Sequence, residues 1–144
     1  MNTIYQSIQG NIGLGKAIEY FTSHGITVAI PLNDTQKYDL IADFNGGLQR
    51  ISVKTSAFTK NGKTYPVVLK NSGGASGKSN IRKFDNTSSD YVFVYTADND
   101  TYLIPSNTIT SEYGIVVRNK ENKYSQYIVF SRTLKEYKED CLKS

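Results

Sequence analysis

The chain has few of the side chains on which many catalytic sites depend. Its 144 residues include one cysteine, Cys141, one histidine, His24, and no tryptophan. A single cysteine excludes an internal disulfide and a cysteine-rich zinc site. A single histidine makes histidine-based metal ligation or a Ser-His-Asp triad very hard to assemble. Neither a disulfide framework nor a histidine-centred active site is therefore expected.

Long apolar runs are also absent. No stretch approaches the ~20 apolar residues that span a bilayer, and residues 1–10 show neither the basic start nor the apolar run of a signal peptide. Hydrophobic residues make up 38% of the chain and charged residues 21%, as in globular proteins. The length is that of one domain. We expect one cytoplasmic domain over residues 1–144.

Acidic residues are missing from one long stretch. Between Asp43 and Asp85 there is none, whereas eight of the 17 basic residues lie there, and the rest of the chain holds nine basic against 13 acidic residues. A basic block inside an ordered domain indicates a polyanionic partner, most often nucleic acid. A solvated basic face without a partner is the alternative.

The residue pattern predicts an α+β protein. Apolar residues at helical spacing predict a helix over 11–24, which Gly25 ends. Alternating and β-branched segments predict the strands, among which 91–95 is the most apolar and is expected to be central. The other expected elements are strands over 26–30, 38–44, 48–53, 64–70, 101–104, 114–118 and 127–130, a short helix over 79–84, and a last helix that Ser131 caps.

Two glycine-lysine segments invite comparison with a phosphate-binding P-loop. Residues 10–16 fit the G-x-x-x-x-G-K pattern, but Ala17 stands where a serine or threonine would hold magnesium. Residues 72–79 end in Gly-Lys-Ser but lack the first glycine. No clear strand precedes the first segment, and only about 65 residues follow the second, too few for the parallel strands and crossover helices of a nucleotide-binding fold. An ATPase is therefore disfavoured.

Glu19, Asp39 and Lys54 form a sharper constellation. A hairpin turn at 45–47 brings the strand after Asp39 beside the strand that carries Lys54. Two carboxylates and a lysine beside basic residues suit metal-assisted phosphodiester hydrolysis, in which carboxylates hold Mg²⁺ and lysine neutralises charge. From spacing alone a non-catalytic interpretation stays open, in which Glu19 lies on a solvated helix face and Lys54 points outward from its strand.

The order of short motifs resembles that of the PD-(D/E)XK nuclease superfamily. Within it, the chain is most similar to the small group I intron-associated homing endonucleases and their phage and bacterial relatives. The resemblance covers about residues 10 to 127. Its motifs are Gly15–Phe21, Ile30–Leu32, Tyr38–Leu40 and Ile51–Thr55, followed by Ser72–Gly74, Phe84-Asp85, Asp90-Tyr91 and Tyr102–Pro105.

This resemblance implies an αβββαβ core, here with extra strands and a C-terminal helix. It also implies Mg²⁺-assisted cleavage of double-stranded DNA by a homodimer or homotetramer. Carried over by position, Asp39 is the metal ligand of the "PD" motif with Tyr38 in place of proline, Glu19 is the acidic metal ligand of the first helix, and Lys54 is the catalytic lysine. Basic and polar residues around the loops are the expected DNA contacts: Gln36, Lys70, Lys78, Arg82 and Lys83.

Ser52 departs from the family pattern. The position normally holds Asp, Glu or, in this subgroup, often Gln, and a neutral hydroxyl does not replace a charged ligand. Three hypotheses follow: a homing-type endonuclease of weakened or lost activity, a catalytically silent DNA-binding protein on the same fold, and an interaction domain whose basic block only aids solubility. Ser52 favours the second hypothesis over the first, and the retention of Glu19, Asp39 and Lys54 favours the first.

Overall fold

The fold begins with a long helix that lies across the sheet. The computed structural model describes residues 3–33, 35–59, 61–72 and 81–143. Helix α1 spans Thr3–Ser23, so it begins eight residues before the predicted start. It ends as predicted at Gly25, whose φ of 72° lets the Ile26 N–H donate to the Phe21 carbonyl at 2.9 Å. The P-loop-like segment 10–16 lies within this helix and forms no loop.

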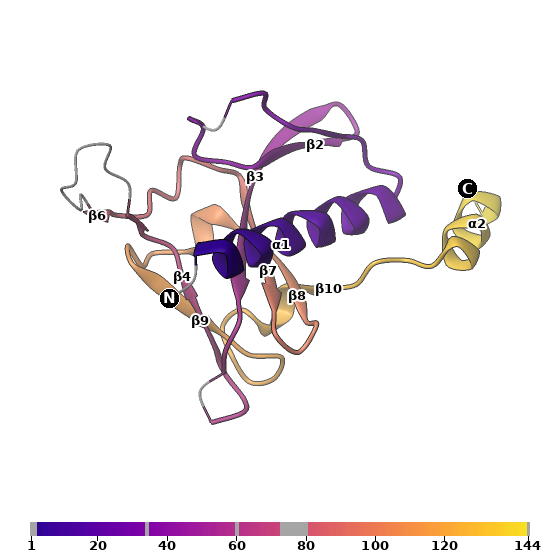
Figure 1. The fold of residues 1–144 in the computed structure, drawn as a ribbon. Helices are drawn as coiled ribbons and strands as arrows, with labels where there is room; N and C mark the ends of the chain where they lie inside the picture. Colours follow the sequence, from indigo (N-terminus) through magenta and orange to yellow (C-terminus); the bar gives the residue numbers. More distant parts are fainter. Residues whose placement is uncertain (1–2, 34, 60, 73–80, 144) are drawn as a thin grey trace.

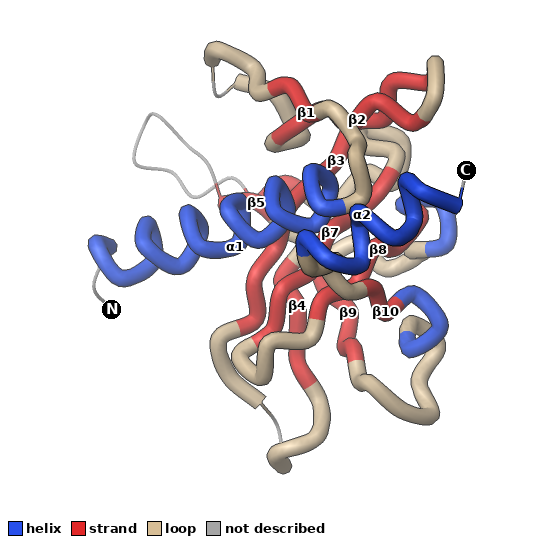
Figure 2. The backbone as a smooth tube through the Cα atoms, turned by 90° about the vertical axis from the view of Figure 1, so that its right-hand side faces the viewer, coloured by secondary structure: helices blue, strands red, loops and turns tan. Residues whose placement is uncertain are grey.

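Six strands form the main sheet, in the order β1-β2-β3-β7-β8-β10 (Figures 1 and 2). All neighbours are antiparallel except β3 and β7, which are parallel. The predicted central strand 91–95 is β7, and its residues Val92, Phe93 and Val94 are fully buried. The strands are β1 (Val28–Ala29), β2 (Leu40–Phe44), β3 (Gly47–Ser56), β7 (Tyr91–Thr96), β8 (Thr101–Pro105) and β10 (Ile128–Val129).

The β2–β3 hairpin turns where the sequence predicts. Asn45 and Gly46 both have positive φ values, 49° and 94°, as a two-residue type I′ turn requires. The turn fixes the register, in which Leu40 faces Ile51. Because side chains alternate along a strand, this register decides which residues of β2 and β3 share a face.

Each face of the sheet has its own apolar core. On one face, Ala17 and Phe21 of α1 pack with Leu40, Ile51 and Phe93. The helix approaches β3 closely at Gly13, where a Cβ atom would lie 2.4 Å from the Thr55 Cγ2 atom. On the other face, buried residues of β7 and β8 pack with those of two further strands, β4 (Tyr65–Val68) and β9 (Gly114–Val117), which pair with each other.

The connection from β3 to β7 differs from the prediction. It carries β4 and a two-stranded ladder of β5 (Asn71–Ser72) and β6 (Ile81–Arg82). The short helix predicted over 79–84 is wrong for residues 81–84, because Ile81 and Arg82 pair with β5 as a strand and Phe84 follows without helical structure. The α+β class is confirmed, although the strands are not all antiparallel.

The C-terminal helix α2 (Leu134–Lys143) lies at the end of an extended segment, apart from the sheet (Figure 1). Thr133, rather than Ser131, caps it: the Glu136 N–H donates to the Thr133 hydroxyl and the Thr133 N–H donates to the Glu136 carboxylate. The two remaining helical turns are short, η1 (Ser106–Thr108) and η2 (Ser125–Tyr127). Within the described ranges, no helix is long and apolar enough to cross a membrane.

Candidate active site

Three of the predicted catalytic residues lie together where β2 begins beside β3. The register that pairs Leu40 with Ile51 places Asp39 opposite Ser52, and opposite residues of an antiparallel pair share a face. Lys54 lies on that same face two residues along β3. We call Asp39, Ser52 and Lys54 the β2–β3 cluster. Ile51 and Val53, which alternate with Ser52 and Lys54 along β3, pack in the α1 core. The β2–β3 cluster therefore lies on the face of the sheet opposite α1.

Main-chain contacts with β3 fix the orientation of Asp39. Its N–H donates to the Ile51 carbonyl at 2.8 Å, and its Oδ2 atom accepts a hydrogen bond from the Val53 N–H at 2.7 Å. The residue is otherwise exposed. A carboxylate can accept on both oxygens, and among the described hydrogen bonds only Oδ2 of Asp39 is used, so the arrangement holds the side chain against the strand.

Lys54 is half-buried. Burial lowers the pKa of its ammonium group, and the nearby Asp39 carboxylate opposes that shift. Ser52, beside it, is only 5% exposed. The cluster therefore combines one oriented carboxylate, one half-buried lysine and one buried hydroxyl.

Ser52 and Lys54 open into a cleft that we call the basic cleft. Its lining includes four basic residues and one acidic residue: Lys37, Ser52, Lys54, Leu69, Arg82, Lys83, Phe84, Asp85 and Ser88. The Lys83 Nζ atom lies 3.3 Å from the Glu112 carboxylate, an ion pair that is exposed on both sides and therefore weak. The excess of positive charge suits a phosphodiester backbone.

The predicted DNA contacts divide between this cleft and its surroundings. Arg82 and Lys83 line it. Gln36 is exposed in the loop before β2, where its amide donates to Asn33 at 3.3 Å, and Lys70 is exposed after β4. Lys78 lies outside the described residues. These assignments stay predictions.

Glu19 does not join the β2–β3 cluster. It lies on α1, which covers the opposite face of the sheet, and its exposed carboxylate lies 3.6 Å from the Lys16 ammonium. The residues of α1 that face the sheet are Ala17 and Phe21, both fully buried. The expected convergence of Glu19 with Asp39 is therefore not found in this structure, and a catalytic role for Glu19 rests on the resemblance alone.

Sequence reasoning missed Lys37 and Asp85 as cleft residues. Lys37 lies outside the acid-free stretch, although it comes two residues before Asp39. Asp85 ends that stretch, and its sequence neighbours do not reveal that it lines the same cleft as Ser52 and Lys54. Contacts with segments distant in sequence, among them the pairing of β7 with β3, place it there.

The donor set suits Mg²⁺ but not a metal held by protein alone. Among the described residues, no three His, Cys, Asp or Glu side chains are close enough to form a cation site. Mg²⁺, however, usually keeps several waters and takes one or two carboxylates together with substrate phosphates. Asp39, in the cluster whose Ser52 and Lys54 line the basic cleft, fits that pattern.

The comparisons with known proteins agree with the fold. The family model for PD-(D/E)XK endonucleases matches residues 4–133. This chain belongs to the PD-(D/E)XK endonuclease family. A solved structure described as that of a bacterial homing endonuclease, I-Ssp6803I, has the same fold: the TM-score is 0.73 at 22% sequence identity, over 85% of this chain and 87% of the other. No curated protein matches the chain in sequence.

Proposed function

We propose that this endonuclease cuts double-stranded DNA site-specifically, in the manner of a homing endonuclease, with the help of Mg²⁺. The observation that carries the proposal is the β2–β3 cluster, in which Asp39 is held against β3 and two members, Ser52 and Lys54, line the basic cleft. Family membership supports DNA as the substrate. The likeness to a homing endonuclease structure is what suggests the homing type.

In this proposal, Asp39 and the phosphates of bound DNA hold the metal. A bound Mg²⁺ would polarise the phosphate and lower the pKa of a water ligand. The Lys54 ammonium donates to the phosphate oxygens and stabilises the charge that grows in the transition state. Lys37, Arg82 and Lys83 bind flanking phosphates, since each lines the same cleft.

Ser52 weakens this site, because its short, neutral hydroxyl has neither the charge of a carboxylate nor the reach of a glutamine amide oxygen. Losing positioned electrostatic stabilisation typically costs about 10²–10³ in rate. We therefore expect slow or undetectable cleavage with DNA binding intact. The second candidate function, a catalytically silent DNA-binding protein, is favoured by this same residue.

We also propose a homodimer or homotetramer, since cutting both strands calls for two sites. The first 13 residues of α1, 3–15, carry no charge. Four of their large apolar side chains are at least half exposed: Ile4, Tyr5, Ile8 and Ile12. Such a stripe suits contact between copies. Sedimentation of the wild type and Ile8→Glu tests this, with a smaller species expected for the variant; a wild type that is monomeric at all concentrations contradicts it.

The experiment that separates the two candidate functions is nicking of a library of DNA fragments in Mg²⁺. Ser52→Glu and Ser52→Gln should cut about 10²–10³ faster than the wild type. Adding Lys54→Ala to either variant, or Asp39→Asn, should remove the gain. If the Ser52 variants bind DNA tightly but none cuts, the chain is a DNA-binding protein and the nuclease proposal is wrong.

A further inference from the structure

Lys83, one of the four basic residues that line the basic cleft, already has a carboxylate partner in Glu112. The Lys83 Nζ atom lies 3.3 Å from the carboxylate oxygen, and both side chains are more than half exposed. A hydrogen bond to Glu112, supported by the attraction of opposite charges, raises the pKa of the Lys83 ammonium, so the lysine is charged at neutral pH. A DNA phosphate that binds Lys83 must therefore compete with Glu112 for the same ammonium group.

The main chain around Glu112 is bound to the cleft on either side of the β5–β6 ladder. The Glu112 carbonyl accepts a hydrogen bond from the Phe84 N–H at 2.7 Å. The next carbonyl, that of Tyr113, accepts from the Leu69 N–H at 2.9 Å. Both donors belong to residues that line the cleft. These bonds fix the main chain of residues 112–113 against the cleft lining, with the Glu112 side chain beside Lys83.

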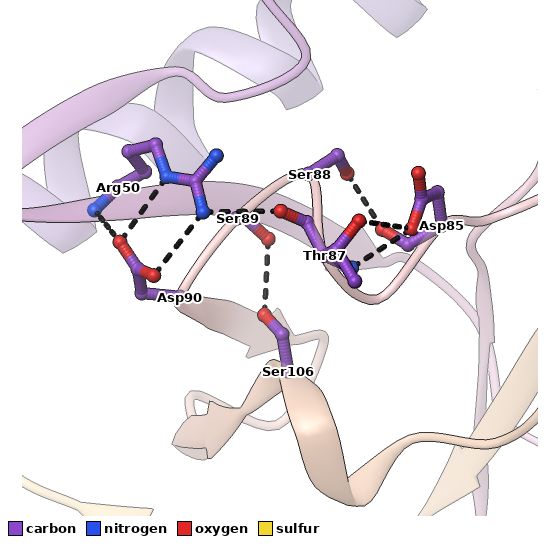
Figure 3. A network of polar contacts seen from close by, with 7 residues as sticks. All are labelled: Arg50, Asp85, Thr87, Ser88, Ser89, Asp90 and Ser106. Atoms are coloured by element: carbon purple, nitrogen blue, oxygen red, sulfur yellow. Dashed lines mark hydrogen bonds and ion pairs between the residues drawn. The ribbon is translucent and has the colours of Figure 1, made fainter.

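A network of polar contacts holds the segment that follows Lys83 to β3 (Figure 3). Arg50 donates from Nε and Nη2 to the two carboxylate oxygens of Asp90, at 3.2 Å each. The same Nη2 donates to the Thr87 carbonyl at 3.0 Å, and the Arg50 N–H donates to Asp90 at 2.7 Å. Two-pronged arginine–carboxylate pairs are strong and directional. Residues 84–90 are therefore held at both ends, by Glu112 at the first residue and by Arg50 at the last.

We infer that Glu112 competes with DNA phosphate for Lys83 and thereby weakens the binding of the basic cleft to DNA of any sequence. The inference rests on the proposed function. Because residues 84–90 are held at both ends and Glu112 is bonded to the first of them, its carboxylate stays within reach of Lys83 when DNA enters. A contact between Lys83 and a phosphate then breaks the ion pair and leaves two anions near one ammonium, and these anions repel each other. Glu112 is thus a positioning residue that acts through Lys83.

A double-mutant cycle tests this, with fluorescence anisotropy of a labelled DNA duplex of random sequence as the measurement. Glu112→Gln keeps the main-chain carbonyl that binds Phe84 and removes the charge. We expect it to raise DNA affinity about two- to fivefold at low salt, the size of effect measured for exposed ion pairs. The slope of log affinity against log salt should steepen by up to about 0.9, since one more cation–phosphate contact then counts in full. In a Lys83→Ala background the same change should have no such effect.

Asp140→Asn is the matched control. It changes the net charge by the same one unit and also removes the carboxylate of an ion pair, that with Arg132, but on α2, so DNA affinity should stay as in the wild type. If Glu112→Gln leaves affinity unchanged, or raises it equally with and without Lys83, Glu112 does not act through Lys83: the inference is wrong and the proposed function stands. If the wild type binds no DNA at low salt, the proposed function fails, and this inference with it.

Discussion

The two faces of the main sheet are built for different tasks. On the α1 face, apolar and aromatic side chains interlock, with Phe21 ring centroids 6.0 Å from Phe44 and 6.2 Å from Phe93. On the other face, the same strand β3 presents Ser52 and Lys54 to the basic cleft. Because side chains alternate along β3, residues that stabilise the fold and residues proposed for catalysis lie one position apart. Substitutions on the two faces should have separable effects.

The largest effect is expected on the α1 face. Phe21→Ala removes a fully buried ring, and such truncations typically cost about 3–5 kcal/mol in the free energy of unfolding. Urea unfolding measures the loss. Phe130→Ala is the control, because Phe130 is 67% exposed and its loss should cost no more than about 0.5 kcal/mol. Equal losses at both positions would contradict the assignment of the core.

On the cleft face, Lys54→Met should lower the cleavage rate rather than the stability of the fold. In a background that cuts, such as Ser52→Glu, it should lower the cleavage rate by about 10² or more without lowering stability. Burial lowers the pKa of Lys54 below its ordinary 10.5, so the folded state disfavours the protonated form. The wild type therefore gains stability as pH rises through the interval between the lowered value and 10.5, and the variant does not.

Two measurements check that prediction. Urea unfolding as a function of pH should show the wild type gaining on Lys54→Met toward alkaline pH. Lys63→Met, an exposed lysine outside the cleft lining, should leave the cleavage rate unchanged. A Lys54→Met protein that is much less stable at neutral pH would make Lys54 a structural residue.

Replacing basic residues of the cleft should weaken DNA binding by a smaller amount for each residue. Arg82→Ala with Lys83→Ala removes two proposed phosphate contacts. The slope of log affinity against log salt should then flatten by up to about 1.8, at about 0.9 per contact on duplex DNA. Affinity should fall on every sequence alike. Fluorescence anisotropy over a salt series measures both, with Lys138→Ala on α2 as the control. An unchanged slope would exclude these two residues as phosphate contacts.

The smallest effect is expected for Glu19→Gln. On the solvent side of α1, this change should alter cleavage by no more than about twofold, as surface substitutions rarely exceed 0.5 kcal/mol. Nicking rates in the Ser52→Glu background provide the measurement, beside Asp39→Asn. A loss as large as that of Asp39→Asn would show that Glu19 reaches the reacting atoms when DNA is bound, as the resemblance implies. The residues that affect cleavage would then not be confined to the cleft face.

Local patterns in the sequence predicted much of this architecture. The apolar run 91–95 identified the central strand, the Asn45-Gly46 turn identified the β2–β3 hairpin, and the hairpin brought Asp39 beside Ser52 and Lys54. These features depend on neighbours within a few residues, or on one turn of known geometry.

What could not be predicted depends on pairing between distant segments. Ile81 and Arg82 look like the start of a helix after a serine, but pairing with β5 overrides that local preference. The parallel pairing of β3 with β7 has no local signal, although it places the segment before β7, which includes Asp85, near β3. The early start of α1 was hidden by Gly10, Gly13 and Gly15, which lower intrinsic helix propensity.

The contact between Arg50 and Asp90 also bears on the order in which parts of the site form during synthesis of the chain. The two residues are 40 positions apart in the chain, and a ribosome adds about 5–20 residues per second. A growing chain therefore carries Asp39, Ser52 and Lys54 on a local hairpin for several seconds before Asp90 is synthesised. Until then Arg50 has no Asp90 to bind, and the 85–90 segment that lines the cleft is not held to β3. During that interval the side chains proposed for catalysis are present without the residues that complete the cleft, so we expect no cleavage by a nascent or prematurely terminated chain.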